Sequence, residues 1–163
     1  MITKRIVFTR ADGGVSIVIP AHEHIDKVFG GDVDAMLAVE MANPKVVPLD
    51  ATNVKVMEVG LIPADDTFRD AWTQASDAIT VDLAKAREIQ AARISHAVDL
   101  EIARLKSSEQ KARLAGRTVA ADADAFVRAD LEVLDKNALS IQIISAPDPT
   151  ALKDIWPAQV PRS

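Results

Sequence analysis

The sequence contains no cysteine and no tyrosine, and its only aromatic residues are four Phe and two Trp. Without cysteine the chain forms no disulfide, no thiolate metal site and no cysteine nucleophile. Because aromatic side chains are scarce, Ala, Val, Leu and Ile must supply most of any hydrophobic core. This composition favours the packing of helices on helices over a large β-sandwich or a deep ligand pocket.

Long hydrophobic runs and an excess of positive charge are also missing. Apolar stretches such as residues 15–19 are far shorter than the roughly 20 residues that span a bilayer, so we expect no membrane span. Residues 1–5 do not follow the order of a secretory signal, which predicts a protein of the cytoplasm or of a particle assembled there. The net charge of −5 argues against nucleic acid as a bulk electrostatic partner.

Proline is absent between residues 64 and 146, whereas the two ends of the chain are rich in it. Charge divides the chain similarly: residues 1–77 hold seven Lys/Arg and twelve Asp/Glu, a balance of −5, and residues 78–163 hold twelve of each. We therefore predict an α+β fold with two domains. A small β-rich head with one short helix is expected over residues 1–81, and a helical hairpin with a C-terminal Trp-Pro segment over residues 82–163.

The front of the chain is rich in β-branched residues. Strands are predicted over residues 5–9, 15–19, 54–59 and 78–81, with a hairpin turn at 10–14. Asp32 is expected to cap a short helix over residues 33–41, and residues 63–72 to form a turn or a single helical turn that ends on Trp72. A sheet of three or four strands needs a cover for one face, so we expect the helix to pack on it.

The middle of the chain has the composition and periodicity of helices. Residues 82 to about 114 contain no Gly or Pro, and Gly116 is expected to end this helix. Thr118 is expected to cap a second helix with Val127, Leu131, Leu134, Ala138 and Ile141 in a 4-3-4-3 repeat, which gives an antiparallel hairpin. Asp148 is expected to cap a last short helix that presents Leu152, Ile155 and Trp156.

Such a hairpin carries more apolar residues than its own seam can bury. The surplus residues are Leu83, Ile89, Leu100, Leu114, Val133, Leu139 and Ile143. Either the front of the same chain covers them, or a second copy or another protein does. We expect a homo-oligomer on this basis.

Few residues suggest chemistry. If their segment is extended, His22 and His24 lie on one side of it, near Asp26, and could hold a divalent metal, but an exposed loop is the simpler interpretation. His96 has no carboxylate placed to orient it and is expected to face solvent. We assign no catalytic, cofactor-binding or metal-binding residue and expect no enzyme.

Two stretches carry a resemblance. Residues 61–72 (LIPADDTFRDAW), followed by residues 79–89 (ITVDLAKAREI), resemble a segment shared by small proteins of tailed bacteriophages and prophages, encoded among tail and virion structural genes. The ending, residues 144–157 (ISAPDPTALKDIWP), is similar to the end of the same proteins and to endings of tail-fibre assembly proteins. The resemblance covers roughly residues 61–157 and brings no catalytic residue with it.

The resemblance implies a virion-associated structural protein of the phage tail or neck that acts by protein–protein packing. Its partners would be other tail or neck proteins and further copies of the chain, and it would lie in the virion tail after a stay in the host cytoplasm during assembly. The alternative is a tail or tail-fibre assembly chaperone that is absent from the mature particle. A small metal-dependent hydrolase that uses His22 and His24 is the third class.

Residues expected to make protein contacts come from both predicted domains. The aromatic residues Phe68 and Trp72 are four residues apart, a spacing that places them on one side of a helical turn. The full set is Phe68, Trp72, Val98, Ile102, Leu105, Leu131, Leu134, Leu152 and Trp156.

Overall fold

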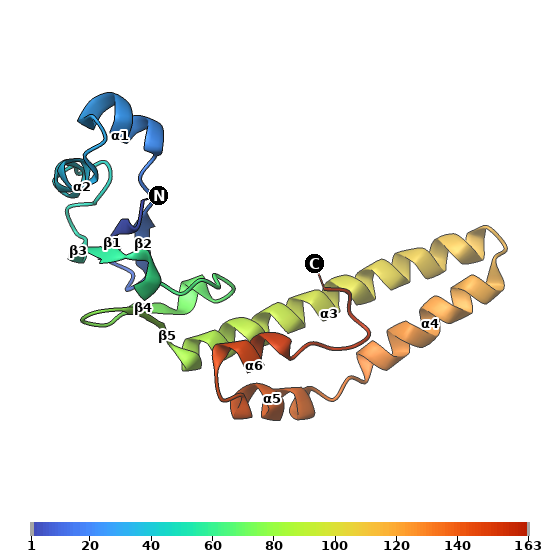
Figure 1. Ribbon diagram of the computed structural model, residues 1–163. Coiled ribbons are helices and arrows are strands. Elements are labelled where there is room, and N and C mark those ends of the chain that lie inside the picture. Colours follow the sequence, from blue (N-terminus) through green and yellow to red (C-terminus); the bar gives the residue numbers. More distant parts are fainter. Residues whose placement is uncertain (1, 163) are drawn as a thin grey trace. The chain divides into compact units, whose positions relative to one another are not determined.

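The computed structural model describes residues 2–162 and has the predicted α+β fold (Figure 1). The chain divides into two compact units, of which the first ends at Asp82 and the second begins at Leu83. We call them the N-terminal unit and the C-terminal unit. In the described residues no helix is both long enough and apolar enough to cross a membrane.

A three-stranded antiparallel sheet forms the centre of the N-terminal unit. Strand β1 (Lys4–Thr9) lies between β2 (Val15–Val18) and β3 (Thr52–Glu58), with Val7 opposite Ile17 and Ile6 opposite Val56. The predicted turn closes the β1–β2 hairpin, where the Arg10 amide donates to the Gly14 carbonyl at 2.8 Å. Three of the four predicted strands are therefore confirmed here.

Two helices follow β2. Helix α2 (Val33–Met41) has the predicted bounds, and the Asp32 carboxylate accepts a hydrogen bond from the Ala35 amide at 2.9 Å, as expected for its cap. Helix α1 (His22–Phe29) occupies the segment that we expected to be an extended loop, so that expectation is wrong. Gly30, at φ +59°, ends α1 in the left-handed conformation that glycine adopts most readily.

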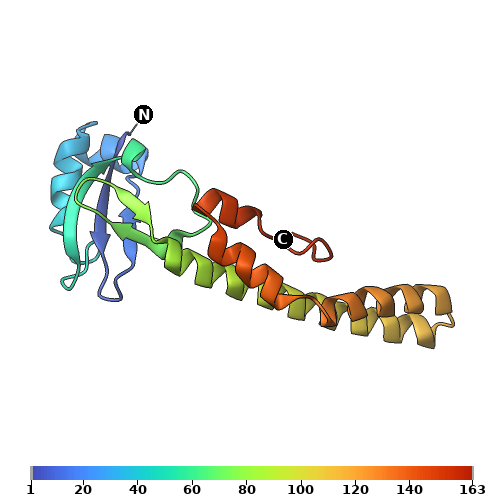
Figure 2. The same cartoon turned by 90° about the horizontal axis from the view of Figure 1, so that it is seen from below.

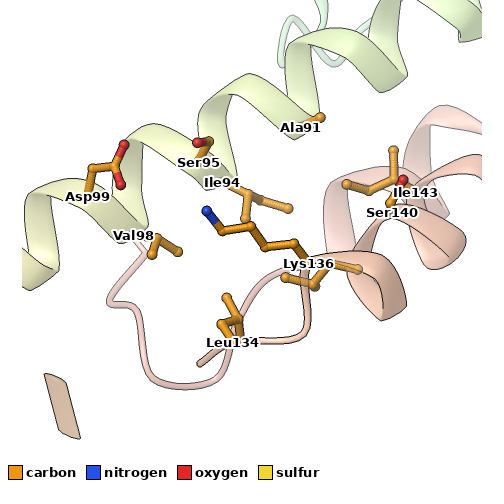
Figure 3. A pocket seen from close by; sticks show the side chains of 10 residues that line it. Ala91, Ile94, Ser95, Val98, Asp99, Leu134, Lys136, Ser140 and Ile143 are labelled. Carbon is orange, nitrogen blue, oxygen red and sulfur yellow. The ribbon is translucent and has the colours of Figure 1, made fainter. Parts of the chain in front are cut away.

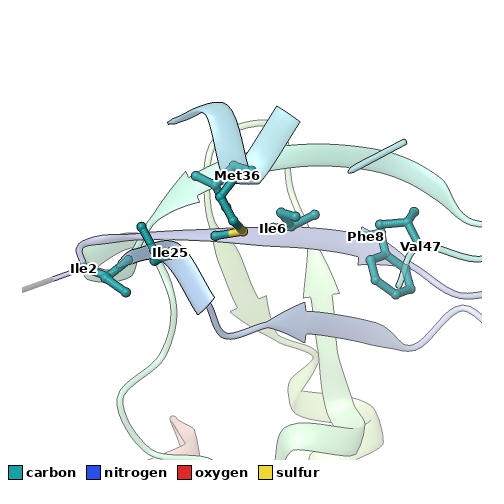
Figure 4. Close-up of a cluster of buried hydrophobic side chains, with 7 residues drawn as sticks. Ile2, Ile6, Phe8, Ile25, Met36 and Val47 are labelled. Atoms are coloured by element: carbon teal, nitrogen blue, oxygen red, sulfur yellow. The ribbon is translucent and has the colours of Figure 1, made fainter. Parts of the chain in front are cut away.

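Both faces of the central strand are buried, because successive side chains alternate between them. On one face Ile6 and Phe8 pack with Ile25 of α1 and with Met36 and Leu37 of α2 (Figure 4). This confirms that the short helix covers the sheet.

On the other face Val7 packs with Trp72 and Ile79. These two residues belong to a separate two-stranded ribbon, β4 (Trp72–Gln74) paired with β5 (Ile79–Val81), where β4 is a strand that we did not predict. The short 3₁₀ helices η1 (Val59–Leu61) and η2 (Arg69–Ala71) precede the ribbon. Trp72 directly follows η2, which agrees with the single helical turn that we expected to end on Trp72.

The C-terminal unit is an antiparallel helical hairpin (Figure 2). Helix α3 (Leu83–Leu114) has 32 residues, which is about 48 Å at 1.5 Å per residue. Gly116, at φ +70°, ends it as predicted, and the Arg117 amide donates to the Ala112 carbonyl at 2.8 Å. This turn leads straight into α4 (Thr118–Glu132), so Thr118 is the first helical residue and not the cap that we expected.

The second arm of the hairpin is broken. Helix α4 ends at Glu132, and α5 (Lys136–Ser145) begins after Asp135, whose carboxylate accepts from the Asn137 and Ala138 amides at 2.9 and 3.0 Å. The prediction of one continuous helix through Leu134 is therefore wrong. Residues of this interruption and of α5 line a groove together with residues of α3.

A last helix, α6 (Pro149–Asp154), lies along the first half of α3 (Figures 1 and 2). The Asp148 carboxylate accepts from the Ala151 amide at 2.8 Å, which confirms the predicted cap. The Gln90 side chain donates to the Ile155 carbonyl at 2.8 Å and fixes the C-terminal segment to α3.

Candidate functional site

The residues predicted to make protein contacts lie mostly inside the chain. Six of them are buried, namely Phe68, Trp72, Val98, Leu105, Leu131 and Leu152. The remaining three, Ile102, Leu134 and Trp156, are half-buried. A partner cannot reach the buried six without rearranging the fold, because they pack against the chain's own side chains. The surface that is open to a partner consists of other residues.

Trp72 and Trp156 illustrate this internal packing. Trp72 lies in the apolar cluster behind the sheet with Val7, Met57 and Ile79. The Trp156 indole N–H donates to the Val160 carbonyl at 2.8 Å and so closes the C-terminal segment on itself. Phe68 precedes η2 and Trp72 follows it, so the two rings do not share one face of a regular helix.

The surplus apolar residues of the hairpin have mixed positions. Ile143 is buried, and Leu83, Ile89 and Leu139 are half-buried. Leu100, Leu114 and Val133 remain 58%, 83% and 79% exposed. Two further exposed side chains, Val119 at 84% and Phe126 at 69%, were missing from our prediction. Their spacing of seven residues was the signal that would have identified them.

An apolar groove lies where the second arm breaks (Figure 3). Ile94 and Val98 of α3 form one wall, while Leu134, Leu139 and Ile143 form the other. The groove measures about 190 Å³. An apolar cavity of about 150 Å³ can hold one benzene molecule, so this groove has room for one large apolar side chain.

Polar groups stand at the edge of this groove. They come from α3 and α5 and are Ser95, Asp99, Lys136 and Ser140. The Lys136 side chain extends across the opening toward α3 (Figure 3). The groove thus combines an apolar floor with one cationic and one anionic group at its edge, which suits binding better than acid–base chemistry.

A chain of six charged side chains connects the two arms of the hairpin. Arg128 is at its centre, 2.9 Å from Glu132 on α4 and 3.3 Å from Glu109 on α3. Glu132 continues to Lys106 at 3.4 Å. At the other end Glu109 pairs with Arg113 at 2.9 Å, and Arg113 pairs with Asp122 at 3.3 Å. These pairs fix the register of α4 along α3.

Hydrogen bonds from arginine lower the pKa values of the glutamates in these ion pairs. Arg113 holds the pKa of Glu109 below its usual value, and Arg128 does the same for the pKa of Glu132. Glu101, a buried carboxylate of α3, accepts two hydrogen bonds from Arg104 at 2.6 and 2.8 Å, and these bonds lower its pKa. All three carboxylates are therefore charged at neutral pH, as structural ion pairs require.

His22 and His24 do not converge. Residues two apart on a helix point about 200° away from each other, so α1 separates the two imidazoles. His24 instead lies 3.4 Å from the Glu40 carboxylate of α2 and contacts the edge of Phe29, with the ring centres 5.4 Å apart. Among the described residues, no three His, Asp or Glu side chains gather in a way that could hold a metal ion.

A second hollow lies in the N-terminal unit, and polar groups that line it are hydrogen-bonded to one another. It measures about 270 Å³ and lies between β3 and the β4–β5 ribbon. The Lys55 ammonium donates to the carbonyls of Ala75 and Ser76, and the Gln74 side chain donates to the Asn53 carbonyl at 2.7 Å. These bonds tie the ribbon to the sheet and give the polar groups a structural role.

Comparison of the chain with protein-family models, with curated proteins and with solved structures found no match.

Proposed function

We propose that the protein is a bacteriophage virion-associated structural protein of the tail or neck region, which acts through protein–protein packing and not through catalysis. Its partners are other tail or neck proteins and further copies of the chain. It is made in the host cytoplasm and ends in the virion tail.

The observation that carries this proposal is the surface of the helical hairpin. Leu114, Val119, Phe126 and Val133 are each more than two thirds exposed, although they lie on well-formed helices or directly beside them. Exposed apolar side chains that lie close together are typical of a surface that binds another protein. Several charged groups of the hairpin, by contrast, pair with one another and hold α4 against α3.

The sequence resemblance supplies the biological setting. Its segments, residues 61–72 with 79–89 and residues 144–157, include η2 with Trp72, the start of α3 and the capped helix α6. These segments contribute buried anchors in both units, which suits a shared scaffold. The resemblance is the reason to propose the tail or neck and not another assembly.

A tail or tail-fibre assembly chaperone is the second candidate. The similarity of residues 144–157 to the endings of tail-fibre assembly proteins favours it. A chaperone would use the same apolar surfaces to cover a partner temporarily.

Mass spectrometry of purified virions separates the two proposals. A structural protein remains in the finished particle in a fixed ratio to known tail proteins, whereas a chaperone is present only in infected-cell lysates. Two results together would contradict both proposals. They are absence of the protein from wild-type virions, and a gene deletion that leaves particle assembly and infectivity unchanged.

The metal-dependent hydrolase is tested by replacing His22 and His24 with Ala. We expect unchanged assembly and infectivity, because helix α1 points the two imidazoles apart. Lys27→Ala, on the same exposed helix, is the matched control.

A further inference from the structure

The groove between α3 and α5 has the same kind of apolar lining on both walls (Figure 3). On α3, Ile94 and Val98 lie one helical turn apart and are buried. On α5, Leu139 and Ile143 have the same spacing and form the opposite wall. Leu134, which precedes α5, completes the lining. The floor of the groove is therefore aliphatic, and it favours an apolar group over a polar one.

Each wall also carries one hydroxyl and one charged group at its edge. On α3 these groups belong to Ser95 and Asp99, which are four residues apart. On α5 they belong to Lys136 and Ser140, again four residues apart. Residues four apart lie on the same side of a helix, so each pair borders the groove over one turn. The edge thus offers an anion from one wall and a cation from the other.

Neither of these charges is neutralised within residues 2–162, which the structure describes. The ion pairs of the C-terminal unit use other side chains, and neither Lys136 nor Asp99 belongs to one. Asp135, the acidic residue next to Lys136, is used as the cap of α5. Lys136 and Asp99 are both exposed, so both charges are accessible to a ligand.

The two charges lie at the same end of the groove. Because α5 runs antiparallel to α3, its first residue, Lys136, lies near Val98 and Asp99 (Figures 2 and 3). Ile143 lies at the other end, near Ala91. Ala91 and Val98 are seven residues apart on α3, which gives about 10 Å of apolar floor beyond the charges. The groove is therefore charged at one end and apolar along the rest.

We propose that this groove binds a free apolar α-amino acid in its zwitterionic form. The carboxylate of the ligand lies at Lys136, its ammonium group lies at Asp99, and its side chain lies on the aliphatic floor. Phenylalanine fits the available space, because the groove measures about 190 Å³ and a cavity of about 150 Å³ accepts a benzene ring. This site goes beyond the proposed packing function and does not depend on it.

The charges distinguish this ligand from other apolar molecules. A fatty acid would leave Asp99 without a partner and place a second anion beside it, and an apolar amine would do the same to Lys136 with a second cation. An apolar residue inside the peptide chain of a partner protein has neither a free carboxylate nor a free ammonium group. Only a zwitterion with one apolar side chain uses both charges and the floor together.

An NMR titration of the full chain with L-phenylalanine tests the proposal. One buried side chain and two surface ion pairs support a weak complex, so we expect a dissociation constant of about 1 mM. Backbone amide signals from residues 91–99 and 134–143 should shift and saturate. Glycine has the same charges without a side chain, and it should cause no saturable shift.

Three analogues of phenylalanine separate the contributions of its groups. Phenethylamine lacks the carboxylate and 3-phenylpropionate lacks the ammonium group, so each should bind about 3-fold more weakly than phenylalanine. N-acetylphenylalaninamide has neither charge and imitates an apolar residue of a partner protein. It should bind more weakly than phenylalanine as well.

Two variants assign the charges to the residues. Lys136→Gln should weaken the binding of phenylalanine and 3-phenylpropionate but not that of phenethylamine. Asp99→Asn should weaken the binding of phenylalanine and phenethylamine but not that of 3-phenylpropionate. Lys111→Gln and Asp130→Asn remove the same charges from exposed residues outside the groove lining and should bind like the wild type. Circular dichroism should show the wild-type helical content in all four variants, since each replaced side chain is exposed.

Three results would overturn the proposal. The first is the absence of saturable shifts in these signals at phenylalanine concentrations well above the expected dissociation constant. The second is N-acetylphenylalaninamide that binds as tightly as phenylalanine, which would identify a partner's side chain as the occupant. The third is unchanged phenylalanine affinity in Lys136→Gln or Asp99→Asn. None of them decides the proposed function, which virion mass spectrometry tests, and absence from virions would leave the titration valid.

Discussion

The two units of this protein bury their apolar residues differently. In the N-terminal unit one strand is covered on both faces, by α1 and α2 on one side and by the β4–β5 ribbon on the other. The C-terminal unit has a narrow seam between two helices and a chain of ion pairs beside it. Both units expose large apolar residues, such as Leu49 in the N-terminal unit and Val119 and Phe126 on α4. Single exposed apolar residues are common on protein surfaces, so exposure alone does not identify a docking face.

The largest effect that separates the units comes from truncating a buried leucine. Leu131→Ala in the hairpin seam and Leu37→Ala under the sheet should each cost about 2–5 kcal/mol of the free energy of unfolding. The fluorescence of Trp156 reports on the C-terminal unit, and that of Trp72 reports on the N-terminal unit. Each is followed in thermal melts of a protein in which the other Trp is replaced by Phe. We expect Leu131→Ala to lower the midpoint of the Trp156 transition, and Leu37→Ala that of the Trp72 transition. Equal shifts of both signals would mean that the two units unfold as one.

A smaller effect is expected at the turn of the hairpin. Gly116 has φ +70°, and a side chain in this left-handed conformation costs about 1–2 kcal/mol. Gly116→Ala should therefore destabilise the C-terminal unit in urea titrations. Gly60→Ala is the matched control in the N-terminal unit, because Gly60 has no positive φ and open space around it. A stable Gly116→Ala protein would indicate that the turn relaxes.

Removing a helix cap should lower the free energy of unfolding by less than the change at Gly116. Asp148→Ala removes the acceptor for the Ala151 amide and should cost about 1 kcal/mol, since the first amides of a helix lack internal partners. Asp154→Ala, at the other end of α6, removes the same charge without removing a cap. Thermal melts followed by Trp156 fluorescence should separate the two variants, and identical midpoints would argue against the cap.

The smallest expected effect is the loss of stability of the C-terminal unit in moderate acid. The pKa values of Glu101, Glu109 and Glu132 lie below the ordinary value of 4.5 because arginine donates hydrogen bonds to each carboxylate. Stability from these pairs is therefore complete above about pH 4.5 and is lost as the pH falls through the lowered values. The Trp156 transition should shift downward in this range, and Glu109→Gln should reduce the shift. An unchanged pH profile in Glu109→Gln would contradict a role for the ion-pair chain.

Much of this fold follows from short-range signals in the sequence. Asp32 and Asp148 precede their helices with a carboxylate in position to accept an amide hydrogen bond, and Gly116 supplies the left-handed residue that ends α3. Each of these signals acts within a few residues, so no tertiary information is needed to interpret it.

The errors arose where a regular pattern concealed a local signal. The apolar repeat continues through Leu134 without Gly or Pro, and this suggested one helix, yet Asp135 is placed to cap a new one. His22 and His24 follow Pro20 and suggested a loop, although Gly30 marks the end of a helix eight residues long. The groove could not be predicted at all, because it depends on how α5 turns after that break.

The predicted contact residues show a further limit. Leu105 and Leu131 were chosen because their spacing gives an apolar side, and that side turned out to be the internal seam. Periodicity identifies an apolar face but does not tell whether the same chain or another copy covers it. The spacing of Val119, Phe126 and Val133 can be read in the sequence, but only the structure shows that α3 covers the opposite side of α4, where Ala121 and Leu131 are buried.

The two units also differ in how far apart along the chain their contacts lie, and this bears on the order of folding. Helices α3 and α4 meet across a turn of three residues, so their pairing requires little loop closure and can follow helix formation, which takes about 0.1–1 μs. Strand β1 must find β3 across the length of two helices, with Ile6 opposite Val56. During synthesis the N-terminal unit emerges first, yet the hairpin that follows it is the part expected to fold faster.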